Sequence, residues 1–127
     1  MPFALAEIDL ITLYGIKNCD TVKKARRWLD DHSIEHQFHD FREQGIDATE
    51  LDRWLADLGW ETLVNRRSTS WKQLDPALRE RMDQAAAKLA ILEHPTLIKR
   101  PLLDTGHEYH VGFSEQKFRD IFSKHTL

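Results

Sequence analysis

The sequence predicts one α/β domain over residues 1–127, in which a strand–helix–strand unit and a strand–strand–helix unit flank a helical insert at about 46–95. Three observations support this fold class. Short apolar runs rich in β-branched or aromatic residues occur near both ends of the chain. Apolar residues recur at helical spacing between these runs. The length also suits a single domain with a hydrophobic core of its own.

The first unit begins after residues 1–7, which we interpret as a short extension before the fold. Residues 8–14 are apolar and β-branched or aromatic, and Gly15 ends them, so they predict a buried strand. Residues 35–41 are partly alternating, which is consistent with a second strand. With a helix between them, the two strands should be parallel and joined by a right-handed crossover.

The helix between these strands should be capped by Asn18 or Asp20, whose side chains can accept from its first N–H groups. Helical spacing then places four apolar side chains on one face. These are Val22, Ala25, Trp28 and Leu29.

The insert should open with a polar loop at 42–48, followed by an amphipathic helix that Thr49 caps and Gly59 ends. The apolar face of that helix comprises Leu51, Trp54, Leu55 and Leu58. A turn or short helix at 60–64 and a polar, basic loop at 65–70 should come next.

The second half of the insert is predicted to be helical. Asp75–Pro76 combines a cap with a proline at the first helical position. The helical pattern then runs to His94, with a break near Asp83, and the proline that follows stops it.

Strand character returns at the end of the chain. Leu102–Leu103 and residues 108–111 predict two short strands, and residues 104–107 supply the turn of a hairpin. Ser114 should cap a last helix. Its inward side chains are Phe118, Ile121 and Phe122. A parallel pair joined to a hairpin and a closing helix is the thioredoxin-like arrangement, although the pattern alone also permits other α/β sandwiches.

Composition argues against several classes of function. The chain has 18 basic and 21 acidic residues, whereas a nucleic-acid binder usually shows a basic excess, so direct nucleic-acid binding is not expected. No apolar run approaches the ~20 residues that cross a bilayer, and the N-terminus lacks the positive region of a secretory signal. A lone cysteine cannot form an internal disulfide, which favours the cytoplasm. Nothing in the sequence requires more than a monomer.

Cys19 lies between the predicted first strand and its helix. The first turn of a helix carries unpaired N–H groups and a partial positive charge, and both favour a thiolate over a thiol. Lys17, Lys23 and Lys24 add positive charge nearby. The alternative is a small buried hydrophobe, since free cysteines are usually buried, but the neighbours of Cys19 are polar.

The position three after Cys19 is Val22, so a CxxC redox pair is excluded. Any disulfide chemistry must therefore be monothiol, and a mixed disulfide on Cys19 needs an external thiol such as glutathione or a glutaredoxin to resolve it.

The histidines do not predict a metal site. His36 and His39, and His107 and His110, are spaced so that two strand side chains point to opposite faces. Neither pair has a third ligand at the usual spacing. We therefore expect no bound metal and no bound cofactor.

Three segments resemble the signatures of the arsenate reductase (ArsC)/Spx family, and most closely its YffB-type branch. They are residues 15–21 around the cysteine, the basic loop at 63–72, and the Lys-Arg-Pro-Leu run at 99–102. The likeness extends over about 8–124. The family fold is thioredoxin-like with a helical insert, which agrees with the elements predicted above.

The resemblance implies that Cys19 is the nucleophile and that Arg100 stands near the thiolate and binds anionic groups. It implies a cis peptide bond at Pro101, a bond that the residues alone leave open. The middle arginine of the family is assigned to Arg67, with Arg66 as the competing assignment. We assign substrate binding to Lys17, Asn18 and Pro101.

Two departures from the family decide among its activities. Arsenate reductases of the family have a further arginine in the terminal hairpin, and residues 106–112 contain none. Spx-type regulators often carry a CxxC switch, which Val22 excludes. The predicted function is therefore a glutathione-dependent monothiol thiol-disulfide reductase. Glutathione is the expected co-substrate, and the expected partners are glutathionylated molecules and a glutaredoxin. The alternatives are glutathione/glutaredoxin-dependent arsenate reduction and a non-enzymatic, Spx-like regulatory role.

Overall fold

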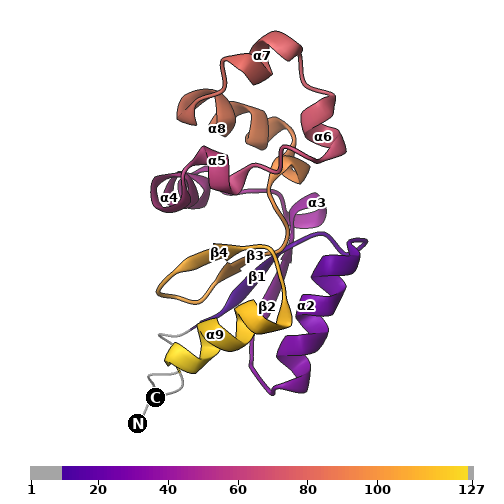
Figure 1. Ribbon diagram of the computed structural model, residues 1–127, viewed down its shortest axis with the longest axis vertical. Coiled ribbons are helices and arrows are strands. Elements are labelled where there is room, and N and C mark those ends of the chain that lie inside the picture. The colour runs from indigo at the N-terminus through magenta and orange to yellow at the C-terminus, as the bar shows by residue number, and fades with distance from the viewer. Residues whose placement is uncertain (1–9, 126–127) are drawn as a thin grey trace.

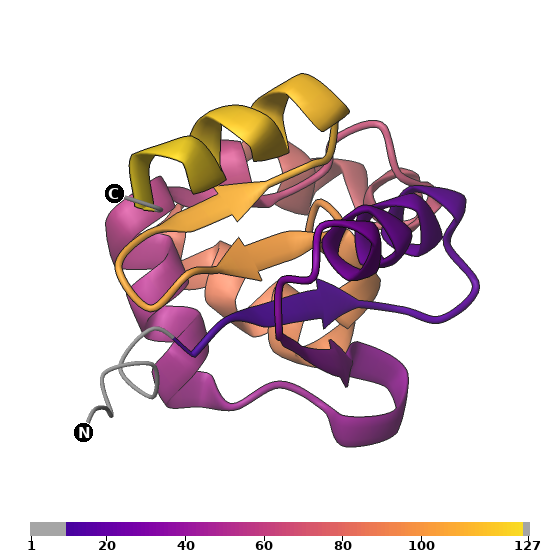
Figure 2. The ribbon, with the colours of Figure 1, turned by 90° about the horizontal axis from the view of Figure 1, so that it is seen from below.

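The computed structural model describes residues 10–125, with side chains as far as residue 123. Its elements form layers around one sheet. Helices α2 (Asp20–Asp31) and α9 (Glu115–His125) lie against one face, and the helical insert lies on the other side (Figures 1 and 2). The mixed α/β class and thioredoxin-like arrangement predicted from the sequence are confirmed.

The sheet has four strands in the order β2-β1-β3-β4. Strand β1 (Thr12–Gly15) pairs in parallel with β2 (Gln37–Asp40), as the strand–helix–strand unit requires. On its other side β1 pairs antiparallel with β3 (Leu102–Asp104), which forms a hairpin with β4 (Tyr109–Val111). The residues assigned to the extension, and the start of the predicted first strand, lie outside the described residues.

The segment between β2 and β3 consists of helices joined by short loops and forms the upper layer of Figure 1. Its elements are α3 (Phe41–Gln44), α4 (Ala48–Leu58), α5 (Trp60–Leu63), α6 (Thr69–Lys72), α7 (Pro76–Glu80), α8 (Gln84–Glu93) and the 3-10 helix η1 (Pro95–Leu97). The break predicted near Asp83 is confirmed, because the Asp83 carboxylate caps α8 by accepting from the N–H of Ala86 at 2.8 Å.

Two apolar clusters cover the two faces of the sheet. One joins the insert to the sheet and includes Leu51, Trp54, Leu63, Ile98 and Leu102. The other joins α2 and α9 to the opposite face and includes Leu13, Ala25, Leu29, Leu103 and Phe118. Neighbouring strand residues thus contribute to opposite clusters, as the alternation of a strand requires. The predicted apolar faces of α2 and α9 are buried as expected.

Two predicted helix caps and one predicted loop boundary are wrong, because the backbone enters each helix at another residue. Cys19, rather than Asn18 or Asp20, occupies the N-cap position of α2. The Asp47 carboxylate accepts from the N–H of Thr49, so α4 begins one residue before the predicted cap. The predicted loop at 42–48 instead begins inside α3, which Asp40 caps.

The predicted basic loop at 65–70 is also shorter than expected. The side chain of Ser68 accepts from the N–H of Trp71, and α6 starts at Thr69. The remaining loop residues, 65–68, are those that carry the two arginines.

Candidate functional site

Cys19 is the N-cap residue of α2, and its side chain makes no capping hydrogen bond. Its carbonyl oxygen accepts from the N–H of Lys23 at 2.9 Å, which closes the first helical turn. The side chain is partly buried and contacts the insert-side apolar cluster. The sulfur is therefore neither a core atom nor fully exposed, and it lies at the positive end of a 12-residue helix.

Gly15 lets α2 approach the sheet closely just before Cys19. A Cβ atom at Gly15 would lie 2.7 Å from Cγ2 and 3.2 Å from Cγ1 of Val22, whose side chain is fully buried. Because packed interiors have little room to adjust, a larger residue at this position would displace the first turn of α2. The glycine at the strand end thus helps set where Cys19 stands.

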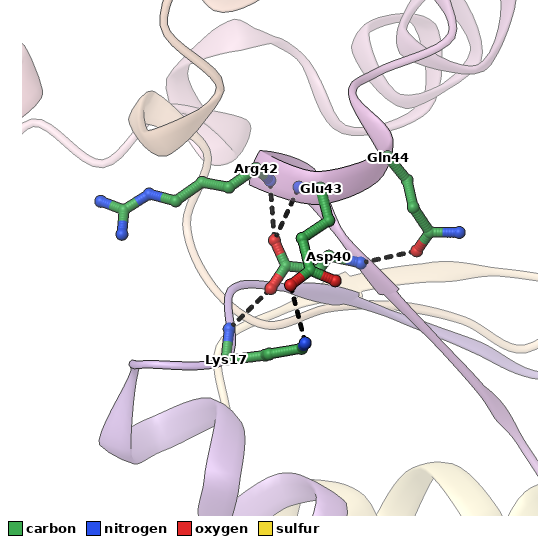
Figure 3. Close-up of polar contacts among 5 residues, drawn as sticks. All are labelled: Lys17, Asp40, Arg42, Glu43 and Gln44. Carbon is green, nitrogen blue, oxygen red and sulfur yellow. Dashed lines mark hydrogen bonds and ion pairs between the residues drawn. The ribbon is translucent and has the colours of Figure 1, made fainter.

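Asp40 fixes the loop that leads to Cys19 (Figure 3). Its Oδ2 accepts from the backbone N–H of Lys17 at 3.0 Å, two residues before the cysteine. Its Oδ1 accepts from the N–H groups of Arg42 at 2.7 Å and Glu43 at 3.2 Å, which begins α3. One carboxylate therefore joins the cysteine loop to the end of β2 and the start of the insert.

Asp40 is only 4% exposed. Burial by itself raises the pKa of its carboxyl, but the three N–H donors and the charge of Lys17 lower that pKa further than burial raises it, so the net shift is downward. Asp40 is thus held as a buried carboxylate whose hydrogen bonds depend on its charge.

The side chain of Lys17 is directed to the insert. Its ammonium pairs with Oε2 of Glu43 at 2.7 Å, and this hydrogen bond raises the pKa of Lys17 (Figure 3). Both side chains are more than half exposed, so the pair contributes little stability.

Segments 63–70 and 96–100, which are far apart in the sequence, are held side by side. The N–H of Asn65 donates to the Leu97 carbonyl at 2.8 Å, and the N–H of Lys99 donates to the Leu63 carbonyl at 2.9 Å. The hydroxyls of Ser70 and Thr96 are also hydrogen-bonded to each other. These contacts bring the basic loop next to the Lys-Arg-Pro segment.

A groove of about 620 Å³ runs between these two segments. Four of its side chains are basic and one is acidic. The lining residues are Glu61, Val64, Asn65, Arg66, Arg67, Lys99, Arg100 and Gly112. A concave surface with this excess of cations is suited to a ligand with more than one anionic group.

The two arginines of the loop differ in their contacts. The guanidinium of Arg66 lies over the Trp60 ring, with Cζ 5.4 Å from the ring centroid. The described residues offer the guanidinium of Arg67 no hydrogen bond or ion pair, although its backbone N–H donates to Asn65 Oδ1. This difference favours Arg67 as the ligand-binding residue and leaves Arg66 to anchor the loop on Trp60.

Arg100 enters the groove from the other side. One of its guanidinium nitrogens donates to the Thr96 carbonyl at 3.3 Å, and no carboxylate among the described residues pairs with it. The Arg100–Pro101 peptide bond is cis, as the resemblance implied. Pro101 is buried, and its carbonyl accepts from the N–H of Gly112 at 2.9 Å, which holds the end of β4 at the groove.

The structure thus brings together Arg67 and Arg100, but Cys19, Lys17 and Asn18 are not among the residues that line this groove. Sequence reasoning also missed Asp40 and Lys99. A carboxylate just before the sequence Phe-Arg-Glu resembles a helix-capping pattern and could have identified Asp40. Lys99 begins the Lys-Arg-Pro-Leu run, but no local pattern marks it as a groove residue, because its place in the groove depends on the tertiary fold.

The described part of the chain contains no cluster of three or more His, Cys, Asp or Glu side chains that could hold a metal ion. Within residues 10–125, every helix is too short or too polar to cross a membrane.

Comparison with known proteins places these features in a family context. The model of the ArsC family matches residues 14–121. An uncharacterized protein of Haemophilus influenzae is 46% identical over 114 residues, covering 90% of this chain and all of that protein. The global transcriptional regulator Spx 2 of Oceanobacillus iheyensis is 30% identical over 118 residues, covering 91% of this chain and 86% of the regulator.

Solved structures of related proteins have a similar fold. A YffB protein superimposes with a TM-score of 0.83 at 44% identity, covering 87% of this chain and 96% of that one. An arsenate reductase-related protein from Brucella melitensis gives a TM-score of 0.74 at 41% identity, covering 96% of this chain and 98% of that one.

Proposed function

The chain belongs to the ArsC family, and on that premise we propose that it is a monothiol thiol-disulfide reductase that uses Cys19 as nucleophile and glutathione as co-substrate. The observation that carries the proposal is the lone cysteine at the N-cap of α2, a partly buried residue at the positive end of a helix. The cationic groove supports an anionic ligand.

The reaction consists of two exchanges. The Cys19 thiolate attacks the glutathionyl sulfur of a substrate–glutathione mixed disulfide. A Cys19–glutathione S–S bond forms, the substrate–glutathione S–S bond breaks, and the departing substrate thiolate takes a proton from water. Reduced glutathione, as its thiolate, then attacks the mixed disulfide. Oxidised glutathione leaves, and Cys19 is a thiolate again. In the net reaction one reduced glutathione sulfur is oxidised to the disulfide level, and the released substrate sulfur is reduced to a thiol.

Local geometry supports the first exchange. At the N-cap position a side-chain acceptor can take the N–H groups of the second or third helical residue. The Cys19 side chain makes no such bond as a thiol, and a sulfur that gains negative charge would be a better acceptor for those donors. Asp20 in the first turn opposes this effect, whereas the helix dipole favours it.

The proposal is tested by mass spectrometry after incubation with oxidised glutathione. We expect one glutathionyl group on Cys19. Reduced glutathione should remove it. An absence of adduct, or an adduct that reduced glutathione cannot remove, would contradict the proposed cycle.

Arsenate reduction is not proposed. The structural neighbours with 21% identity that are named arsenate reductases share the fold alone. Residues 106–112, which form most of the terminal hairpin beyond β3, contain no arginine. An arsenate ion at the groove would therefore have fewer guanidinium donors than one in a family member with an arginine in this hairpin.

Arg100→Met and Arg67→Met should each weaken the binding of a glutathionylated substrate. A charge-assisted hydrogen bond contributes about 1.5–3 kcal/mol, so each change should raise KM at least about tenfold. The rate of alkylation of Cys19 by a neutral reagent should change less. Steady-state reduction of a glutathionylated peptide measures KM.

Arg66→Met is the matched control, because it removes the same charge from the same loop. Since Arg66 stacks on Trp60, we expect a smaller increase in KM and some loss of loop stability. A larger effect of Arg66→Met than of Arg67→Met would reverse the assignment of the middle arginine.

A further inference from the structure

Two lysines lie in or next to the groove. Lys99 lines the groove, and Gly112, the next lining residue, directly follows β4. Lys117 lies in the first turn of α9, and its ammonium donates to the carbonyl of Val111, the residue before Gly112, at 2.5 Å. The ammonium of Lys117 is therefore hydrogen-bonded to the backbone next to Gly112, in the same groove that Lys99 lines.

Lys117 is an unusual lysine for a helix surface. It is half-buried, and both its burial and the nearby charge of Lys99 lower its pKa. Among the described residues, no carboxylate pairs with Lys99 or Lys117. The charges of Lys99 and Lys117 therefore repel each other, and Lys117 retains two further N–H donors.

The lining of the groove also includes one carboxylate. Glu61 lines the groove together with Arg66 and Arg67, which follow it closely in the chain, so acidic and basic groups occur together. An α-amino acid group, which carries an ammonium beside its carboxylate, matches this part of the lining. A carboxylate with no ammonium beside it matches the two lysines.

We propose that Lys99 and Lys117 form a second anion-binding position, which binds the free C-terminal carboxylate of a small peptide thiol or disulfide whose amino-acid end lies toward Glu61 and Arg67. This inference rests on the proposed function and specifies its substrate class: peptides with two separated carboxylates. A carboxylate between the lysines would replace their repulsion with two charge-assisted hydrogen bonds.

The test separates binding from thiol chemistry by using S-methylglutathione, which cannot exchange disulfides. Calorimetric titration of the wild-type protein compares this ligand with its glycine ethyl ester, in which only the C-terminal carboxylate is blocked. We expect the diacid to bind at least about tenfold more tightly than the ester, as one charge-assisted hydrogen bond would give.

Lys99→Met and Lys117→Met should each weaken binding of the diacid about tenfold and leave binding of the ester nearly unchanged. Lys99→Met is the easier variant to interpret, because no described residue forms a hydrogen bond with the Lys99 side chain. Lys117→Met also removes the hydrogen bond to Val111. Arg119→Met is the control, since Arg119 lies on the same helix and pairs with Glu115 on the exposed side.

Equal affinity of the wild-type protein for diacid and ester would overturn the second anion-binding position. So would a loss in the lysine variants that is the same for both ligands or is matched by Arg119→Met. These outcomes are independent of the proposed reaction, which is tested separately by the removable glutathionyl group on Cys19.

Discussion

Replacement of Cys19 by serine should reduce thiol-disulfide exchange to the level of the buffer. The chain contains one cysteine, so no other thiol can replace it. The fold should persist, because serine is a favourable N-cap residue and α2 begins directly after this position. Two measurements check the prediction: glutathionyl uptake by mass spectrometry, and thermal unfolding, which should show an unchanged or slightly raised midpoint.

The serine variant also separates an enzyme from a regulatory protein. Relatives of this chain are named global transcriptional regulators, and a role in docking a protein partner would survive the loss of the sulfur. Reductase activity that persists in Cys19→Ser would eliminate the monothiol mechanism. A cellular phenotype that persists while activity disappears would favour the regulatory alternative.

The sequence predicted the parts of this fold that depend on local periodicity. Val22, Ala25 and Leu29 follow the helical repeat, and all three are buried against the sheet. The hairpin around residues 104–107 was likewise found from its turn residues. Helix starts were less predictable, because several neighbouring polar side chains can cap a helix, and only the path of the backbone decides among them.

The site was less predictable than the fold. Cys19 stands out because it is the lone cysteine and follows a strand. The groove depends on hydrogen bonds between segments 63–70 and 96–100, and no spacing in the sequence encodes such a contact. Lys117 is separated from Lys99 by the whole terminal hairpin, so their proximity also results from tertiary structure alone.

Asp40→Ala should cause the largest loss of stability among the polar substitutions considered. The change removes the acceptor of three backbone N–H groups, and two of these, at Lys17 and Arg42, lie on different segments. Hydrogen bonds to charged groups contribute about 1.5–3 kcal/mol each, and partial access of water recovers some of this, so we expect a loss of about 3 kcal/mol. Urea unfolding measures it.

Asp40→Asn is the matched variant, because it keeps the shape and one acceptor oxygen while it removes the charge. We expect it to lose about half as much stability as the alanine variant. The glutathionylation rate of Cys19 should fall in both variants, since the N–H of Lys17 anchors the loop two residues before the sulfur. A stable Asp40→Ala protein with unchanged reactivity would show that the carboxylate does not position the loop.

The pH dependence of folding stability tests whether the charge of Asp40 causes these losses of stability. The pKa of Asp40 is lowered in the folded chain, whereas an unfolded aspartate titrates near ~3.9. The folded state therefore binds fewer protons at this group. The contribution of the Asp40 carboxylate to stability is complete above the unfolded pKa and is lost as pH falls through the folded pKa.

The stability difference between wild type and Asp40→Asn should be constant above about pH 5 and should shrink as the pH falls below about 4. Urea midpoints measured across this range test the sign. A difference that does not change with pH would mean that Asp40 acts through its shape and its oxygen atoms rather than through its charge.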